Sequence, residues 1–326
     1  MMAENKIKIV FIGGAGRSGT TLLDRILGQV NGFFSLGEIH HMWERSFIEN
    51  QLCGCGKPFK ECEFWQAVVK EAFGGFEQVD AQHILRLQRS VARIRHTPQL
   101  VFPRLRSKEF RSSLREYIET LECLYGAIAK LSGCEVLIDS SKAPPHAFAL
   151  SEMSNIDLSV IHLVRDSRAV VNSWQRKKRR PEIHWKVEYM PRLGLLKGTQ
   201  EWILSNWLNG LLRNRVGLYK VVEYDTLAER PKTTVSKILE WLCVKSANLD
   251  FFINENWVKL GIDHTVSGNP IRFKQGVMEI RPDREWMEKM PWFKKCLVTA
   301  LTYSLLRGYR KAGGSEAHSI GEDGDG

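Results

Sequence analysis

The sequence contains no long hydrophobic run. The apolar stretch LVTALTYSLL near the C-terminal end is far shorter than the roughly 20 apolar residues of a membrane-spanning helix. The first apolar segment, from Ile7 to Ile12, ends in glycines, whereas a signal peptide needs a longer apolar core and a cleavage site. We therefore expect neither a membrane span nor a signal peptide, and we predict a cytoplasmic protein.

Acidic residues are scarcer than basic ones, because 37 Asp and Glu stand against 47 Lys and Arg. The resulting formal net charge of +10 favours anionic partners such as a nucleotide, an acidic acceptor or nucleic acid. The basic run from Arg176 to Pro181 fits nucleic-acid binding, a solvated helix end, or a rim that attracts an anionic ligand. The sequence lacks an aromatic RNA-binding signature, a zinc finger and a helix-turn-helix, so we expect no nucleic acid as a partner.

Only seven cysteines are present, and three of them, Cys53, Cys55 and Cys62, are clustered. Three sulfurs are one ligand short of a closed structural zinc site, which His40 or His41 would complete. A disulfide is a second interpretation, and a reduced cluster is a third. We favour the reduced cluster, because thiols stay reduced in a cytoplasmic protein.

Short buried strands alternate with amphipathic helices, which indicates an α/β fold with a mainly parallel central sheet covered by helices on both faces. The predicted strands lie at 7–12, within 31–38, and at 135–141, 157–166 and 217–225. The predicted helices lie at 20–29, within 84–131, from 144, from 167 through the basic run, and at 194–214, 232–242 and 291–309.

The pattern predicts one domain over residues 1–312, with a Cys-rich loop and a helical insertion over about 50–132. The Gly-rich, acidic tail over residues 313–326 is predicted to be disordered. Ligands of parallel sheets bind at the carboxyl ends of the strands, so the polar motifs that follow the strands are the candidate sites.

The stretch GGAGRSGTTLL joins the first predicted strand to the first predicted helix. Gly14 and Gly19 keep the spacing of a phosphate-binding loop, in which the backbone N–H groups, here those of residues 16 to 21, surround an oxyanion. Thr20 replaces the lysine of ATP- and GTP-binding loops, and Arg17 supplies a positive charge within the loop. This replacement argues against a P-loop small-molecule kinase, which remains an alternative.

A second basic motif, HLVRDSRAVVNSW, begins in a later predicted strand. Arg165 ends that strand, and Ser173 lies about two turns into the next helix, so both side chains would reach one further anionic group. An arginine at a strand end is also often a surface ion pair, here with the adjacent Asp166. A ligand with two separated anionic groups would bridge the two motifs.

The two motifs together resemble the sulfotransferases that use 3′-phosphoadenosine 5′-phosphosulfate. GRSGTTLL is similar to their 5′-phosphosulfate loop, and VRDSRAVVNSW is similar to their 3′-phosphate motif. Further matches extend the resemblance from Gly13 to about Phe273, namely CGCGKPFKECEFW, IDSSKAP, VVEYDTLAERP and HTVSGNPIRF. The resemblance is closest to the branch with an arginine in the loop, which includes tyrosylprotein and many bacterial sulfotransferases, and it implies a P-loop-like central parallel sheet.

The resemblance implies sulfuryl transfer from this donor to a hydroxyl or amine, with no metal in catalysis. The residues implied for donor binding are Gly16, Arg17, Ser18, Gly19, Thr20, Thr21, Arg165, Ser173, Tyr224, Gly268 and Arg272. Lys142, which would otherwise be a solvated loop lysine, and Arg17 would stabilise the departing phosphate oxygen. Glu38 is the predicted general base, ahead of His41 and then His40.

The acceptor is expected to be a small molecule, a carbohydrate or a peptide, and no motif distinguishes among these classes. The helical insertion and the loop at 176–198 are the segments expected to select it. Trp174, Trp185, Trp202 and Trp207 either line an acceptor cleft or belong to the core.

Overall fold

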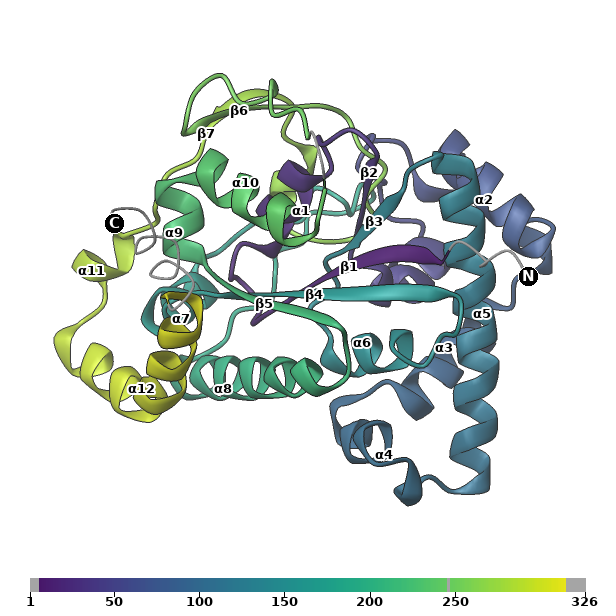
Figure 1. Ribbon diagram of the computed structural model, residues 1–326, viewed down its shortest axis with the longest axis horizontal. Helices are drawn as coiled ribbons and strands as arrows, with labels where there is room; N and C mark the ends of the chain where they lie inside the picture. The colour runs from purple at the N-terminus through teal and green to yellow at the C-terminus, as the bar shows by residue number, and fades with distance from the viewer. Residues whose placement is uncertain (1–5, 245–246, 315–326) are drawn as a thin grey trace, which may run out of the picture.

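The computed structural model describes residues 6–244 and 247–314 and has an α/β architecture (Figure 1). Within these residues, five parallel strands form one sheet in the order β2-β3-β1-β4-β5. The strands are β1 (Ile7–Gly13), β2 (Phe33–Gly37), β3 (Val136–Asp139), β4 (Ile156–Val164) and β5 (Leu218–Glu223). The predicted fold class is confirmed, and each predicted strand is present.

Strand β1 is apolar and buried from Ile9 to Ile12, because both faces of the sheet are covered there. Successive side chains of a strand point to opposite faces. Ile9 and Phe11 accordingly pack into the core on one side of the sheet, and Val10 and Ile12 pack into the core on the other side. All four side chains are at most 2% exposed.

Helices form a layer on each face of the sheet, and Figure 1 shows α1 and α10 on the side opposite α6 and α8. The first layer consists of α1 (Thr20–Leu27), α9 (Tyr224–Glu229) and α10 (Pro231–Trp241). The second layer includes α2 (Glu63–Phe73), α3 (Ala81–Val91), α5 (Lys108–Ser132), α6 (Pro144–Leu150) and α8 (Leu195–Leu211). At one end of the sheet, α7 (Ser167–Gln175), α11 (Glu285–Lys289) and α12 (Trp292–Gly314) pack together.

The helical insertion lies between β2 and β3 and comprises α2, α3, α4 (Thr97–Val101) and α5. The predicted apolar faces belong to α3 and α5, which pack against each other. The predicted face of α3 extends one turn too far, because Ile94 lies beyond the end of the helix and is 49% exposed. A π-helix over Met42–Ile48 was not predicted from the sequence.

The basic run is not part of a helix, which corrects the helix predicted through it. Helix α7 ends at Gln175, and Arg176 continues in an extended conformation. Its guanidinium is held outside the helix by ion pairs with Asp283 and Glu285. The interpretation of this run as a solvated helix end is therefore wrong.

A two-stranded antiparallel sheet, which the sequence analysis missed, consists of β6 (Trp257–Leu260) and β7 (Gly276–Glu279). These strands hold the two ends of the loop over residues 261–275, which we call the rim loop. The loop contains one short 3-10 helix over Pro270–Phe273. The tail predicted to be disordered lies, from residue 315 onward, outside the described residues.

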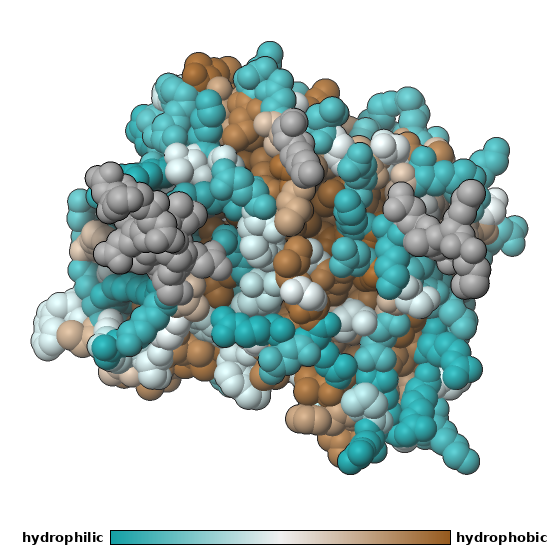
Figure 2. Space-filling view, in the orientation of Figure 1, coloured by the Kyte–Doolittle hydropathy of each residue, from teal (hydrophilic) through white to brown (hydrophobic). Residues whose placement is uncertain are grey.

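Polar side chains cover much of the outer rim of the face in Figure 2, and apolar side chains appear between them over the middle of the molecule. None of the helices within residues 6–244 and 247–314 is both long and apolar enough to span a membrane.

The rim loop is fixed to α1 by one fully buried side chain, Arg25. Its guanidinium donates hydrogen bonds to the carbonyl oxygens of Gly261, Ile271, Arg272 and Lys274, at 2.6 to 3.0 Å. The same guanidinium forms an ion pair with the carboxylate of Asp263. The conformation of the rim loop therefore depends on α1, although the two are more than 200 residues apart in the sequence.

Arg25→Ala should lower the free energy of unfolding by about 3–5 kcal/mol, because it removes the positive partner of the largely buried Asp263 carboxylate and the donors to four carbonyl groups. Urea denaturation measures this change. Arg111→Ala is the control, because Arg111 is exposed on α5 and its loss should change stability by less than about 0.5 kcal/mol. Similar losses for both variants would contradict the role of Arg25.

Candidate active site

The carboxyl ends of the five strands place the predicted site residues in one row. Glu38 follows β2, Lys142 follows β3, the glycine loop follows β1, Arg165 follows β4 and Tyr224 follows β5. After β1 the chain forms β2 and β3 on one side of β1, and it then forms β4 and β5 on the other side. The glycine loop therefore lies at the point where the strand order reverses, which is where parallel sheets bind ligands.

A cavity of about 340 Å³, which we call the donor cavity, opens at this edge of the sheet. The predicted residues that line it are Gly16, Arg17, Gly19, Thr20, Thr21, Glu38, His41, Lys142, Arg165, Ser173, Tyr224 and Gly268. Its wall also contains residues that the sequence analysis did not assign to a site, including Arg45, Lys178, Met190, Asn269 and Asp283. Segments from Gly16 to Asp283 thus meet around one space.

The spacing of the loop glycines has a steric cause. Gly14 has φ 137°, and a Cβ there would lie 2.3 Å from the carbonyl oxygen of Leu163 on β4. Gly19 has φ 92°, and a Cβ there would lie 2.6 Å from the ring of Tyr224. Only glycine therefore lets the loop pass this close to the neighbouring strand and helix.

The loop offers fewer backbone donors than the sequence predicted. The N–H of Gly16 donates to the carboxylate of Glu201 at 3.2 Å, and the N–H of Ser18 donates to the carbonyl oxygen of Ala15 at 3.2 Å. Ser18 is also fully buried and does not line the donor cavity. The remaining backbone donors lie in the first turn of α1, where N–H groups have no partner within the helix.

Arg17 presents buried hydrogen-bond donors at the donor cavity. Its guanidinium lies 4.8 Å from the ring centre of Trp174, and Nη1 donates to the sulfur of Met190 at 3.1 Å. Nε and Nη2 are buried and have no hydrogen-bond partner among the described residues. Burial lowers the pKa of Arg17, while the nearby carboxylate of Glu38 acts in the opposite direction. Such unpaired donors fit an oxyanion.

Arg165 forms an ion pair with Asp283 and not with its neighbour in sequence, Asp166. Its Nη1 donates to the carbonyl oxygen of Arg17 at 3.0 Å, and its Nη2 donates to the carboxylate of Asp283 at 2.9 Å. Its guanidinium also stacks 4.4 Å from the ring centre of Tyr224. Nε is buried without a partner among the described residues. Asp166 pairs instead with arginines of α7 and α12.

Asp283 is the carboxylate that balances the arginines at this end of the donor cavity. Burial alone would raise its pKa, but hydrogen bonds from Arg176 and Arg165 outweigh this effect and lower the pKa to about 2. Asp283 therefore stays ionised at neutral pH. An anionic ligand group that approached Arg165 would compete with this carboxylate.

Glu38 and Lys142 form an ion pair at the other end of the donor cavity. Glu38 is only 7% exposed, and Nε2 of His41 lies 3.7 Å from its second carboxylate oxygen. Burial, followed by the positive charge of Arg45, keeps the pKa of His41 well below its ordinary value. His41 is therefore a neutral imidazole near pH 7, and the lowered pKa makes it a weaker proton acceptor than an ordinary histidine.

The turn that carries Lys142 is anchored by buried hydrogen bonds. The N–H of Ser141 donates to the carboxylate of Asp139 at 2.8 Å, and the hydroxyl of Ser140 donates to Asp24 at 2.7 Å. Lys142 itself has φ 59°, and Arg17 has φ 73°. Strained backbone of this kind clusters at functional sites, where the surroundings hold it in place.

Besides Ser18, two predicted residues, Arg272 and His40, do not line the donor cavity. Arg272 is 1% exposed, and its guanidinium donates to the carbonyl oxygens of Thr265 and Leu52. Its two terminal nitrogens therefore join the rim loop to the Cys-rich loop, away from the donor cavity, which corrects its predicted contact with the donor. His40 lies behind His41, where burial lowers its pKa to about 3 and its N–H donates to Ser141.

A second cavity of about 560 Å³, which we call the side cavity, lies next to the donor cavity. The two share Gly16, His41, Lys142 and Trp174 in their walls. Residues 92–95 of the helical insertion, His40 and Glu201 also line the side cavity. Trp185 and Trp207 are 49% and 52% exposed, whereas Trp202 is fully buried, so the four tryptophans do not form one surface.

Some residues of the cavity walls were not predicted as site residues, and they differ in whether the sequence around them has a recognisable pattern. Lys178 belongs to the basic run, for which a rim that attracts an anionic ligand was one of three interpretations. Glu201 lies in the predicted helix at 194–214, and Asp283 lies outside every predicted element. Neither carboxylate has a local pattern that indicates a site.

Comparison with known proteins supports one family. A sequence model described as the sulfotransferase family matches residues 10–247. No match was found among curated proteins.

Three solved structures are similar to this chain. The sulfotransferase domain from the curacin biosynthetic pathway is 17% identical, with a TM-score of 0.48, and the match covers 91% of this chain and 97% of that domain. The sulfotransferase domain from the Synechococcus PCC 7002 olefin synthase is 18% identical, with a TM-score of 0.47 and coverages of 94% and 96%. The sulfotransferase STF9 from Mycobacterium avium is 13% identical, with a TM-score of 0.42 and coverages of 94% and 77%.

These identities and TM-scores are low, so the assignment depends on the family match, which includes the glycine loop, β1 to β5 and the basic motif at Arg165. The chain therefore belongs to the sulfotransferase family and is a sulfotransferase enzyme.

Proposed function

We propose that the enzyme transfers a sulfuryl group from 3′-phosphoadenosine 5′-phosphosulfate to a hydroxyl or amine of an acceptor. The observation that carries this proposal is the donor cavity, where two sets of anion-binding side chains meet. The glycine loop with Arg17 forms one set, and Arg165 with Ser173 forms the other. The orphaned buried donors of Arg17 and Arg165 support a ligand with two separated anionic groups.

In this proposal the loop binds the 5′-phosphosulfate. Thr20 and Thr21 lie in the wall of the donor cavity and supply hydroxyl donors beside the start of α1. Arg165 and Ser173 bind the 3′-phosphate, and Tyr224 packs against the guanidinium of Arg165. The 3′-phosphate would displace the carboxylate of Asp283 from Arg165.

The transfer step needs a base, an electrophile and stabilisation of the leaving group. The acceptor oxygen or nitrogen forms a bond to sulfur while the bond from sulfur to the phosphate oxygen breaks, and the electron pair of that bond stays on the phosphate. Glu38 accepts the acceptor proton. Lys142 and Arg17 stabilise the negative charge that develops on the phosphate oxygen.

The side cavity is the proposed acceptor site, because it opens onto the same wall as the donor cavity. Its residues from the helical insertion support the expectation that this insertion selects the acceptor. His41 is the second candidate for the base, since it lines both cavities and is neutral. Glu38 lines the donor cavity but not the side cavity. It forms an ion pair with Lys142.

Thermal unfolding in the presence of ligands tests the donor assignment. Adenosine 3′,5′-bisphosphate at a hundredfold excess over its Kd should stabilise the protein by about 2.7 kcal/mol. ATP with Mg²⁺, or an oligonucleotide, should stabilise it much less. Preferential stabilisation by ATP with Mg²⁺ would favour a kinase, and preferential stabilisation by the oligonucleotide would favour a nucleic-acid-binding protein.

Arg165→Ala should weaken the binding of adenosine 3′,5′-bisphosphate by about 1.5–3 kcal/mol, because it removes a charge-assisted hydrogen bond to the 3′-phosphate. Binding of adenosine 5′-monophosphate, which lacks that phosphate, should change little. Calorimetric titration of both ligands measures the difference. Equal losses for both would show that Arg165 does not bind the 3′-phosphate.

Glu38→Gln keeps the size of the side chain and removes the base, so kcat should fall by about 10²–10⁴-fold. Adenosine 3′,5′-bisphosphate should still stabilise the variant against heat. His41→Asn and His40→Asn are measured beside it with the same acceptor. If Glu38→Gln stays within a few-fold of the wild type while His41→Asn loses activity, then His41 is the base.

Lys178→Ala should weaken donor binding more than Arg179→Ala does. Lys178 lines the donor cavity, where burial and the charges of Arg17 and Arg176 lower its pKa, whereas Arg179 is exposed in the same run. An exposed charge acts through a screened field and contributes less to binding. The Kd of adenosine 3′,5′-bisphosphate for each variant decides between a specific contact and a general effect of the basic run.

A further inference from the structure

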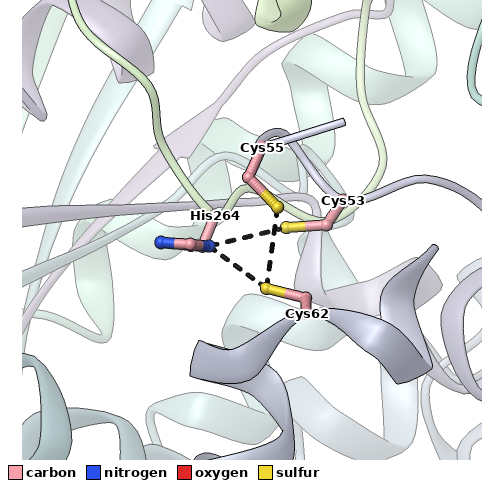
Figure 3. Close-up of side chains that lie close together, drawn as sticks. All are labelled: Cys53, Cys55, Cys62 and His264. Carbon is pink, nitrogen blue, oxygen red and sulfur yellow. Dashed lines mark hydrogen bonds between the residues drawn. The ribbon is translucent and has the colours of Figure 1, made fainter. Parts of the chain in front are cut away.

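Three cysteines and one histidine converge outside the donor cavity (Figure 3). Cys53, Cys55 and Cys62 come from the Cys-rich loop that precedes α2, and His264 comes from the rim loop. In the close-up, the three sulfur atoms and one ring nitrogen of His264 point toward a common centre. The four ligand atoms all lie within 4.8 Å of one another.

Three distances within the cluster lie within about 0.4 Å of those between the ligands of one tetrahedral zinc ion. With Zn–S near 2.3 Å and Zn–N near 2.05 Å, tetrahedral angles place two sulfurs about 3.8 Å apart and a sulfur and a nitrogen about 3.6 Å apart. The sulfurs of Cys55 and Cys62 are 3.7 Å apart. Nδ1 of His264 lies 3.2 Å from the sulfur of Cys62 and 3.9 Å from that of Cys53.

We propose that these four residues, which we call the Cys3His cluster, bind one zinc ion with a structural role. Thiolate and imidazole are ligands that zinc prefers, and four protein ligands leave no open position for a substrate. The space between four atoms within 4.8 Å of one another holds a single ion and is too small for a cluster of several irons. This proposal replaces the reduced cluster that the sequence favoured.

The fourth ligand is His264 and not His40 or His41, because those two histidines belong to the side and donor cavities. The position of His264 is supported from two sides. Nε1 of Trp65 donates to its carbonyl oxygen at 2.8 Å, and the ring of Phe64 stacks on its imidazole at 5.1 Å. Ligands that are held by neighbouring groups in this way are typical of metal sites.

The ion would connect the Cys-rich loop to the wall of the donor cavity. Next to His264, the carbonyl oxygen of Thr265 accepts the N–H of Gly54 at 2.9 Å. One residue further, the carbonyl oxygen of Val266 accepts the N–H of Glu38 at 2.7 Å, and Gly268 lines the cavity. The zinc ion thus fixes segments about 200 residues apart in sequence, without a ligand inside the donor cavity.

Metal analysis of the full-length protein, purified under reducing conditions from cells grown with zinc, tests the proposal. The wild type should contain one zinc per chain, and His264→Ala and Cys55→Ser should lose most of it. Cys123→Ser is the matched control, because Cys123 is an exposed cysteine of α5. Full zinc content in His264→Ala, or wild-type protein without zinc, would overturn the proposal.

A second measurement covers the case in which the variants do not fold. Wild-type protein exchanged into Co²⁺ should show the intense visible absorption of a tetrahedral thiolate site, and added Zn²⁺ should remove it. An octahedral spectrum, or a Cys55–Cys62 disulfide found by mass spectrometry of the unreduced protein, would contradict a Cys3His zinc site. These measurements use neither donor nor acceptor, so their outcome is independent of the proposed reaction.

Discussion

The active-site architecture depends on how closely the glycine loop approaches its neighbours. A side chain at Gly14 would collide with the backbone of β4, and one at Gly19 would collide with Tyr224. This contact brings the carbonyl oxygen of Arg17 within 3.0 Å of the guanidinium of Arg165. Two basic motifs that are 148 residues apart therefore share one cavity, and neither would form the site without the other.

Concentrating positive charge in a cavity creates a repulsion that the fold offsets with carboxylates. Arg17, Arg165 and Lys178 line the same space, and Asp283 and Glu38 face them. Asp283 is held ionised by two arginines, and Glu38 is in contact with Lys142. In the proposed reaction, an anionic donor takes over part of this role, which explains why acidic side chains lie where phosphate groups are expected to bind.

The rim loop forms part of the wall of the donor cavity through Gly268, Asn269 and Ile271. Arg25 binds carbonyl oxygens near both ends of the loop, and the Cys3His cluster includes His264 near its start. Val266 and Asn269 lie between these attachments: the carbonyl oxygen of Val266 accepts the N–H of Glu38, and the N–H of Asn269 donates to the hydroxyl of Thr21. The side chain of Arg25 and the proposed zinc ligands thus add to the backbone hydrogen bonds that join Val266 to the end of β2.

Local patterns in the sequence determined much of this protein. The apolar run of β1, the glycine spacing and the separation of Arg165 from Ser173 are set by neighbours within one strand, turn or helix, and each was predicted. The order of the strands then placed Glu38, Lys142 and the loop at one edge, as expected for a parallel sheet.

Tertiary structure alone decided which side chains became partners. Asp283 accepts a hydrogen bond from Arg165, which is 118 residues away in the sequence. His264 contacts Cys62, 202 residues away, and Glu201 accepts the N–H of Gly16, 185 residues away. No period or spacing links such positions, because packing of loops, and not local geometry, brings them together. For the same reason Arg272 was predicted to bind a ligand but binds carbonyl groups of its own chain: the sequence shows that a charge is present, and only the fold shows what faces it.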